Sequence, residues 1–118
     1  MKLQINQKFI KANTELKVGN TILSITPPLD EDYWIFRVQL SENQSIVAFP
    51  KFFTIGIGFQ HEEDWNCNLP YTCNTEEILN HILHNKQDET ISDGSCFDAI
   101  KIIQETIKQM NLTGELEL

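Results

Sequence analysis

The first half of the chain alternates apolar and polar residues in short runs, a pattern typical of β-strands. Runs at residues 15–18 and 21–26 flank the pair Gly19-Asn20, and this arrangement predicts a two-residue hairpin whose centre needs a positive φ. The run at residues 33–40 alternates most regularly. One face of that run consists of Trp34, Phe36, Val38 and Leu40.

Two more strand-like runs follow, at residues 45–49 and 51–59, with Pro50 between them. In the later run Gly56 and Gly58 leave one face of the strand nearly bare, which predicts a β-bulge or the close approach of another element. We expect one of the C-terminal helices to lie over these glycines. The opposite face of that run is predicted to carry the large side chains Phe53, Ile55, Ile57 and Phe59.

Two helices are predicted after the strands, because apolar residues there recur at helical spacing. Asn74 and Glu77 form a capping-box pattern at the start of the first helix, which ends near Asn85. The second helix begins at Ser92 or Ser95. The apolar stripes of the two helices are Ile78, Leu79, Ile82 and Leu83, and then Phe97, Ile100, Ile103, Ile107 and Met110.

These elements predict an α+β fold, an antiparallel meander of about five or six strands followed by two helices packed on one face. The 118 residues, 41% hydrophobic and 22% charged, fit a single domain over residues 1–118 and exclude disordered and fibrous classes. No signal-peptide core or membrane-spanning run is present near the N-terminus, so we expect a cytosolic protein. The cysteines are too few for a disulfide scaffold and are expected to be reduced, namely Cys67, Cys73 and Cys96.

The net charge of −8 is unevenly distributed. Residues 1–29 carry four lysines and one glutamate, whereas residues 60–98 carry nine acids and a single base, Lys86. An acidic surface repels nucleic acid, since phosphate binding requires lysine and arginine. It would attract a basic protein, with an attraction that weakens in salt. The alternative is that the acidity only keeps the protein soluble.

Residues 60–73 read QHEEDWNCNLPYTC and show neither a helical nor a strand period. We expect an irregular connection of about 15 residues here, longer than most loops of compact domains. If this connection binds a partner, its acids would attract a basic protein, and the side chain of Trp65 or Tyr71 would be buried against that protein. Alternatively the connection has only a structural role, and Trp65 belongs to the hydrophobic core. The predicted partner-binding residues of this stretch and the first helix are Glu62, Glu63, Asp64, Trp65, Tyr71, Glu76 and Glu77.

A zinc site is the alternative use of the same region, through a C-x5-C-x7-H-x2-H pattern. The cysteine spacing is wider than in established structural zinc sites, so no cofactor is expected. Cys96, near the start of the second helix, could be a nucleophile with a lowered pKa, but no paired base is evident. The candidate zinc ligands are Cys67, Cys73, His81 and His84, and an enzyme could use His61 as well.

The sequence therefore favours a small acidic, non-catalytic binding or regulatory protein of the cytosol, with an acidic loop and helix facing a basic protein partner. An immunity or inhibitor protein that covers a basic site is one example of this class. The alternative is a metalloprotein or enzyme that uses the Cys/His cluster around residues 61–84.

Overall fold

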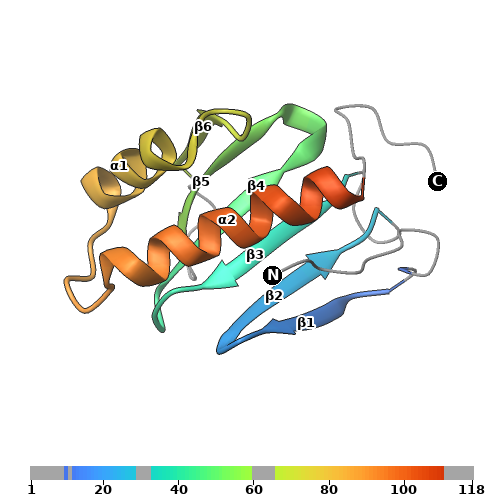
Figure 1. The fold of residues 1–118 in the computed structure, drawn as a ribbon, viewed down its shortest axis with the longest axis horizontal. Helices are drawn as coiled ribbons and strands as arrows, with labels where there is room; N and C mark the ends of the chain where they lie inside the picture. Colours follow the sequence, from blue (N-terminus) through green and yellow to red (C-terminus); the bar gives the residue numbers. More distant parts are fainter. Residues whose placement is uncertain (1–9, 11, 29–32, 60–65, 111–118) are drawn as a thin grey trace.

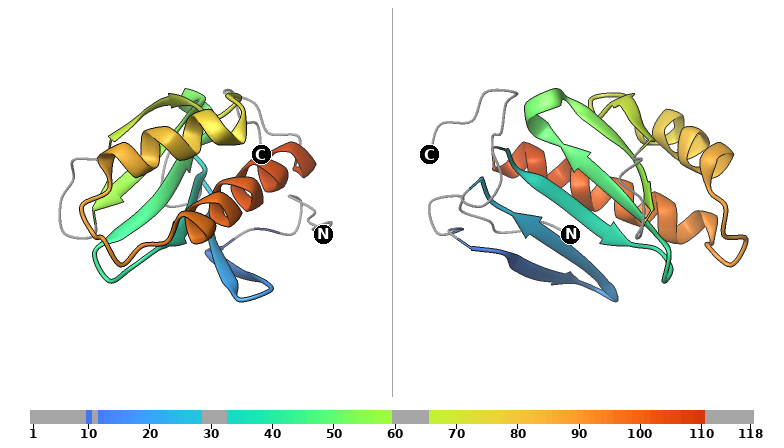
Figure 2. Two further views of the ribbon diagram at one scale, coloured as in Figure 1. Left: turned by 60° about the vertical axis from the view of Figure 1, so that its left-hand side comes forward. Right: turned by 180° about the vertical axis from the view of Figure 1, so that it is seen from behind.

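The computed structural model describes residue 10 and residues 12–28, 33–59 and 66–110 (Figure 1). Six strands form one antiparallel sheet in which each strand pairs with the next along the chain. Two helices lie on one face of this sheet (Figure 2), so the predicted α+β meander with C-terminal helices is confirmed. The elements are β1 (Thr14–Val18), β2 (Thr21–Thr26), β3 (Ile35–Gln39), β4 (Gln44–Phe49), β5 (Thr54–Phe59), β6 (Asn66–Pro70), α1 (Thr75–Asn85) and α2 (Asp93–Gln109).

The predicted hairpin joins β1 and β2. Val18 pairs with Thr21, which leaves two residues in the loop, and Gly19 has a φ of 62°. A glycine at the first position of a two-residue loop matches the right-handed twist of the two strands without a steric penalty. The hairpin prediction is therefore confirmed.

The core lies between the sheet and the helices. α1 packs over β5 and β6, and α2 packs over β2, β3 and β4. The alternation predicted for residues 33–40 holds, because Trp34, Phe36 and Val38 are buried in this core. The buried helix residues are Ile78 and Ile82 of α1 and Cys96, Ala99, Ile100, Ile103 and Ile107 of α2.

Both helices begin at the predicted caps. The side-chain oxygen of Asn74 accepts a hydrogen bond from the Glu77 amide at 2.8 Å, and its amide group donates to the Glu77 carboxylate at 3.0 Å. At the start of α2, the Ser92 hydroxyl accepts a hydrogen bond from the Ser95 amide at 3.1 Å. Each cap satisfies a backbone donor that the first helical turn leaves without a partner.

A buried glutamine holds the connection between the two helices against the sheet. Gln44 of β4 is 1% exposed, and its Oε1 accepts hydrogen bonds from the amides of Gln87 and Asp88, both at 3.0 Å. A carbonyl oxygen that accepts two backbone donors fixes the loop more firmly than packing alone, because breaking the contact would leave buried polar groups unpaired. Neither helix has the length and hydropathy needed to span a bilayer, within the part of the chain that the structure describes.

The prediction that a helix covers Gly56 and Gly58 is wrong. Ile55 and Ile57 of β5 belong to the core beneath the helices, and successive residues of a strand point to opposite faces. The two glycines therefore face away from the helices, with Gly56 paired to Val47 across the β4–β5 ladder. The bulge predicted as the alternative is present, because the β5–β6 register shifts between Ile55 and Ile57.

Phe53 also departs from the prediction, which placed it on the same face of the strand as Ile55. The chain makes a 3₁₀ turn at Pro50–Phe52, and Phe53 follows it in the left-handed conformation, with φ 57° and ψ 30°. Its amide donates to the carbonyl oxygen of Pro50 at 3.1 Å, and β5 begins only at Thr54. A left-handed conformation costs a residue with a side chain roughly 1–2 kcal/mol.

The expected irregular connection is shorter than predicted, because it contains the edge strand β6. Leu69 of β6 pairs with Ile55 and packs partly buried against the core. Pro70 ends the strand at the sheet edge, where a residue without a backbone donor is tolerated. The short strand and its bulge obscure the two-residue period that would have revealed it in the sequence.

Candidate partner-binding surface

Three of the seven predicted partner-binding residues lie in the described part of the chain: Tyr71, Glu76 and Glu77. The other four, Glu62, Glu63, Asp64 and Trp65, lie outside the described residues, as does His61. Tyr71 belongs to the turn between β6 and α1, and the two glutamates belong to the first turn of α1. The structure thus places the three in one short segment that leads from the sheet edge into the helix. We call Tyr71, Glu76 and Glu77 the entry surface.

Tyr71 is half-buried and fixed from two sides. Its ring stacks on the Phe53 ring with centroids 5.9 Å apart and planes 9° apart. Its amide donates to the Phe53 carbonyl oxygen at 3.0 Å, and its ring packs against the core. Burial raises the pKa of the Tyr71 hydroxyl above its ordinary value.

A single side chain of α2 holds the turn that carries Tyr71. The Gln104 Nε2 donates hydrogen bonds to the carbonyl oxygens of Tyr71 at 3.0 Å and Cys73 at 2.8 Å. The Gln104 Oε1 accepts one from the Thr75 hydroxyl at 2.9 Å. The amide of one residue of α2 thus binds both the turn and the start of α1.

The two acids of the entry surface are exposed. Both lie in the first turn of α1, where the helix dipole stabilises negative charge, so a structural reason for their position exists beside any functional one. The positive end of the helix dipole partly offsets the negative electrostatic potential of these two carboxylates. Glu77 also accepts a hydrogen bond from Asn74, whereas Glu76 stands exposed beside it.

A cluster of aromatic rings at the β4–β5 connection was not foreseen from the sequence. Phe52 and Phe53 are 53% and 48% exposed, unusual values for neighbouring large apolar side chains. The Tyr33 ring contacts Phe52 and Phe49 edge-on, with centroids 5.0 Å and 5.6 Å apart. We call Tyr33, Phe49, Phe52 and Phe53 the aromatic corner. The signal that could have revealed it is a pair of consecutive phenylalanines shortly after Pro50, between two strands.

The zinc prediction stays a prediction, because the side chain of Cys67 lies outside the description. Among the described residues, no group of three or more His, Cys, Asp or Glu side chains could hold a metal ion. Cys73 precedes α1 and His84 lies in its last turn, and the helical rise separates His84 from the first residue of α1 by about 13 Å. His81 is half-buried, and its buried Nε2 has no hydrogen-bond partner among the residues that the structure describes.

The two described thiols are not activated. Burial, and then the Glu77 carboxylate, raise the pKa of the Cys73 thiol. Cys96 lies in the first turn of α2 as predicted but is fully buried, and this burial raises its thiol pKa despite the nearby Lys86 ammonium. The lowered pKa that the nucleophile alternative would require is therefore not found for Cys96.

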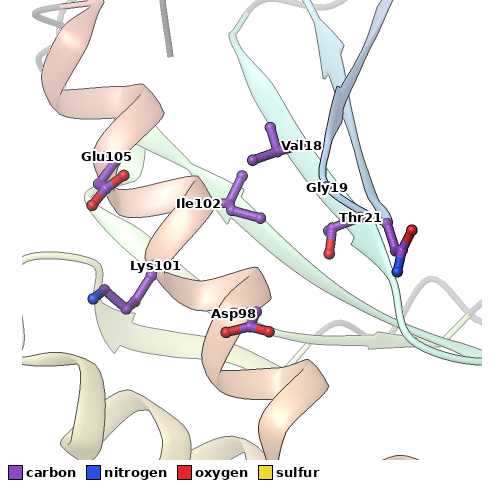
Figure 3. Close-up of a pocket in the computed structure, with 8 residues that line it drawn as sticks. Val18, Gly19, Thr21, Asp98, Lys101, Ile102 and Glu105 are labelled. Atoms are coloured by element: carbon purple, nitrogen blue, oxygen red, sulfur yellow. The ribbon is translucent and has the colours of Figure 1, made fainter. Parts of the chain in front are cut away.

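A hollow of about 380 Å³ lies between the β1–β2 hairpin turn and the outer face of α2 (Figure 3). Ile102 points toward Val18 across it, while Asp98, Lys101 and Glu105 supply charges of both signs. The Lys101 ammonium lies 5.5 Å from the Phe97 ring, so it already has a neighbour on its own helix. Mixed charges on a shallow surface select no particular ligand charge, and the hollow carries no functional assignment.

Comparisons of the chain with protein-family models, with curated proteins and with solved structures found no match. The function proposed for it therefore depends on the geometry of its own residues. Among those residues, the entry surface is the place where predicted partner-binding groups and a fixed backbone coincide.

Proposed function

We propose that this protein is a non-catalytic binding or regulatory protein of the cytosol, and that its entry surface receives a basic protein partner. The observation that carries the proposal is that one short segment holds both a half-buried Tyr71, fixed by Gln104 and Phe53, and the exposed carboxylates of Glu76 and Glu77. Tyrosine and other aromatic residues supply short-range binding energy at interfaces, and exposed charges steer the approach of an oppositely charged partner.

Rigidity supports the proposal. A side chain that is already ordered loses little conformational entropy when a partner covers it, so more of the contact energy appears as affinity. Tyr71 is ordered by its stack on Phe53 and by the hydrogen bonds of Gln104.

Charge supports the choice of partner. The net charge of −8 favours a basic protein over nucleic acid, whose phosphates such a surface repels. An inhibitor or immunity protein that covers a basic site is the form of this function that suits a small acidic chain, and it requires no catalytic group.

Affinity capture with two matched baits tests the proposal. In Glu76→Gln/Glu77→Gln the entry surface loses two charges, and in Glu15→Gln/Glu42→Gln two exposed acids on β1 and the β3–β4 loop are removed instead. Both baits have the same net charge, so only the position of the change differs. We expect that the wild type and the Glu15→Gln/Glu42→Gln control retain a basic protein, and that the Glu76→Gln/Glu77→Gln bait retains less of the same protein.

The captured protein is then purified, and its association is measured by stopped flow at rising salt concentration. Loss of the two entry-surface charges should slow association and flatten its salt dependence, while dissociation changes little. Equal retention of every basic protein by the two baits would contradict the proposal, because the attraction would then depend on net charge alone.

A further inference from the structure

The aromatic corner combines exposure with backbone strain. Phe53 adopts φ 57° and ψ 30°, a region that glycine and asparagine enter easily and that bulky residues avoid. The turn itself needs only the backbone hydrogen bond from Phe53 to Pro50, which any residue can make. Because 48% of the Phe53 side chain remains exposed, core packing does not account for a phenylalanine here. Strained residues of this kind concentrate at functional sites.

The rings around that residue form two groups, which meet along the chain at the consecutive residues Phe52 and Phe53. Phe52 contacts Tyr33 and lies 6.4 Å from Phe49 between centroids, and Phe53 stacks on Tyr71. The Lys51 ammonium lies 5.9 Å from the centroid of the Phe52 ring, so a cation already approaches one ring of the corner within the protein. Aromatic faces attract cations electrostatically, and arginine can also stack flat on them.

Two exposed carboxylates follow Tyr71 closely along the chain. Phe53 is joined to Tyr71 by a ring stack and a backbone hydrogen bond, and α1 with its two exposed glutamates begins four residues after Tyr71. A guanidinium group is planar and bears several donors, so it can stack on a ring while it donates to a neighbouring carboxylate. The ammonium of lysine cannot do both in the same geometry.

We infer that the aromatic corner binds an arginine-bearing segment of the basic partner, with Phe53 as the stacking surface and the entry surface supplying the carboxylates. The inference rests on the proposed function and adds to it the preference for arginine over lysine. A second copy of the chain and an anionic membrane are disfavoured as occupants, because both would bring negative charge toward a protein of net charge −8.

The experiment uses the full chain, labelled with ¹⁵N, and two peptides of equal length, one of arginines and one of lysines. Chemical shifts of the backbone amides are followed during each titration. Phe53→Asn removes the stacking ring but tolerates the left-handed conformation, so the relief of backbone strain should offset the lost stack on Tyr71 and the variant should fold. The matched control is Ile22→Ser, because Ile22 of β2 is 49% exposed and β2 lies three strands away from β5, which Phe53 precedes.

The inference predicts that the arginine peptide shifts the amides of Phe53 and Tyr71 and binds about fivefold more tightly than the lysine peptide. Phe53→Asn should abolish this preference, and Ile22→Ser should keep it. If both peptides bind equally and only Glu76→Gln/Glu77→Gln weakens them, the inference is overturned while the proposed function survives. If neither peptide binds, both are overturned. Binding to phosphatidylserine vesicles, or self-association, that depends on Phe53 without an arginine preference would also overturn the inference.

Discussion

The side-chain amide of Gln104 donates a hydrogen bond to the carbonyl oxygen of Tyr71, from the middle of α2 to a turn 33 residues earlier in the chain. The same amide bonds Cys73 and Thr75, so three polar groups of the turn depend on one residue. The position of the proposed anchor is therefore determined by the packing of α2 on the sheet. Loss of this one amide should affect both stability and partner binding.

Replacement of Gln104 by alanine tests that dependence. The variant leaves two partly buried carbonyl oxygens without their donor, and we expect a loss of roughly 1–3 kcal/mol in the free energy of unfolding. Urea denaturation measures it, with Gln109→Ala at the exposed end of α2 as the control. Equal midpoints for the two variants would show that the turn does not need Gln104.

The cap of α1 provides a second test. Asn74→Ala removes the oxygen that accepts from the Glu77 amide, and we expect a loss of about 1 kcal/mol. Asn80→Ala changes the same residue type at an exposed position inside α1, where alanine favours the helix, and should not destabilise. Thermal melts of the two variants should therefore shift in different directions or by clearly different amounts.

A third prediction separates backbone conformation from packing. A methyl group at Gly19 or at Gly94 would meet no atom within 4 Å, so neither Gly→Ala change creates a clash. Gly19 has a positive φ, so Gly19→Ala should lower the free energy of unfolding by about 1 kcal/mol. Gly94 lies in the first turn of α2, so Gly94→Ala should raise the free energy of unfolding by up to about 1 kcal/mol. Opposite shifts of the denaturation midpoint are expected, and shifts of the same sign would contradict this explanation.

The elements that depend on local rules could be predicted from the sequence. The Gly19 hairpin, the Asn74 cap and the alternation around Phe36 each follow from interactions within a few residues. The direction in which Gly56 faces could not be predicted, because both faces of β5 are buried and only the position of the helices distinguishes them. An alternating run does not say which of its faces the helices will cover.

The candidate site was predictable only in part, for a similar reason. Glu76 and Glu77 follow from a recognisable helix start, and Tyr71 stood out as an aromatic residue beside a proline. Gln104 shows no local signal, because its role depends on a contact across more than thirty residues. Phe53 was misassigned because its left-handed conformation moves it out of the alternation that the sequence suggests.

The metal alternative is tested by native mass spectrometry of protein purified without chelator. We expect a mass that corresponds to three free thiols and no bound ion, because no set of donors converges in the part of the chain that the structure describes. Stoichiometric zinc that is lost together with stability in Cys67→Ser or Cys73→Ser would establish the metal site instead.

The last prediction concerns the reactivity of the Cys73 thiol. Partial burial and the Glu77 carboxylate both favour the neutral thiol and raise its pKa. At a given pH a raised pKa means less thiolate, which is the reactive species, so alkylation should be slow and its rate should rise only at high pH. Glu77→Gln removes the negative charge, lowers the pKa and should shift the rate profile toward lower pH.

Peptide mapping after timed alkylation with iodoacetamide reports each cysteine separately. Glu76→Gln is the control, because it removes the same charge one residue away from the acid that contacts Cys73. The profile of Cys73 should move with Glu77→Gln and remain near the wild-type profile with Glu76→Gln. Cys96, which is fully buried, should resist alkylation in both variants until the protein unfolds. Equal shifts in the two variants would mean that the general acidity of the surface, rather than the contact with Glu77, determines the thiol pKa.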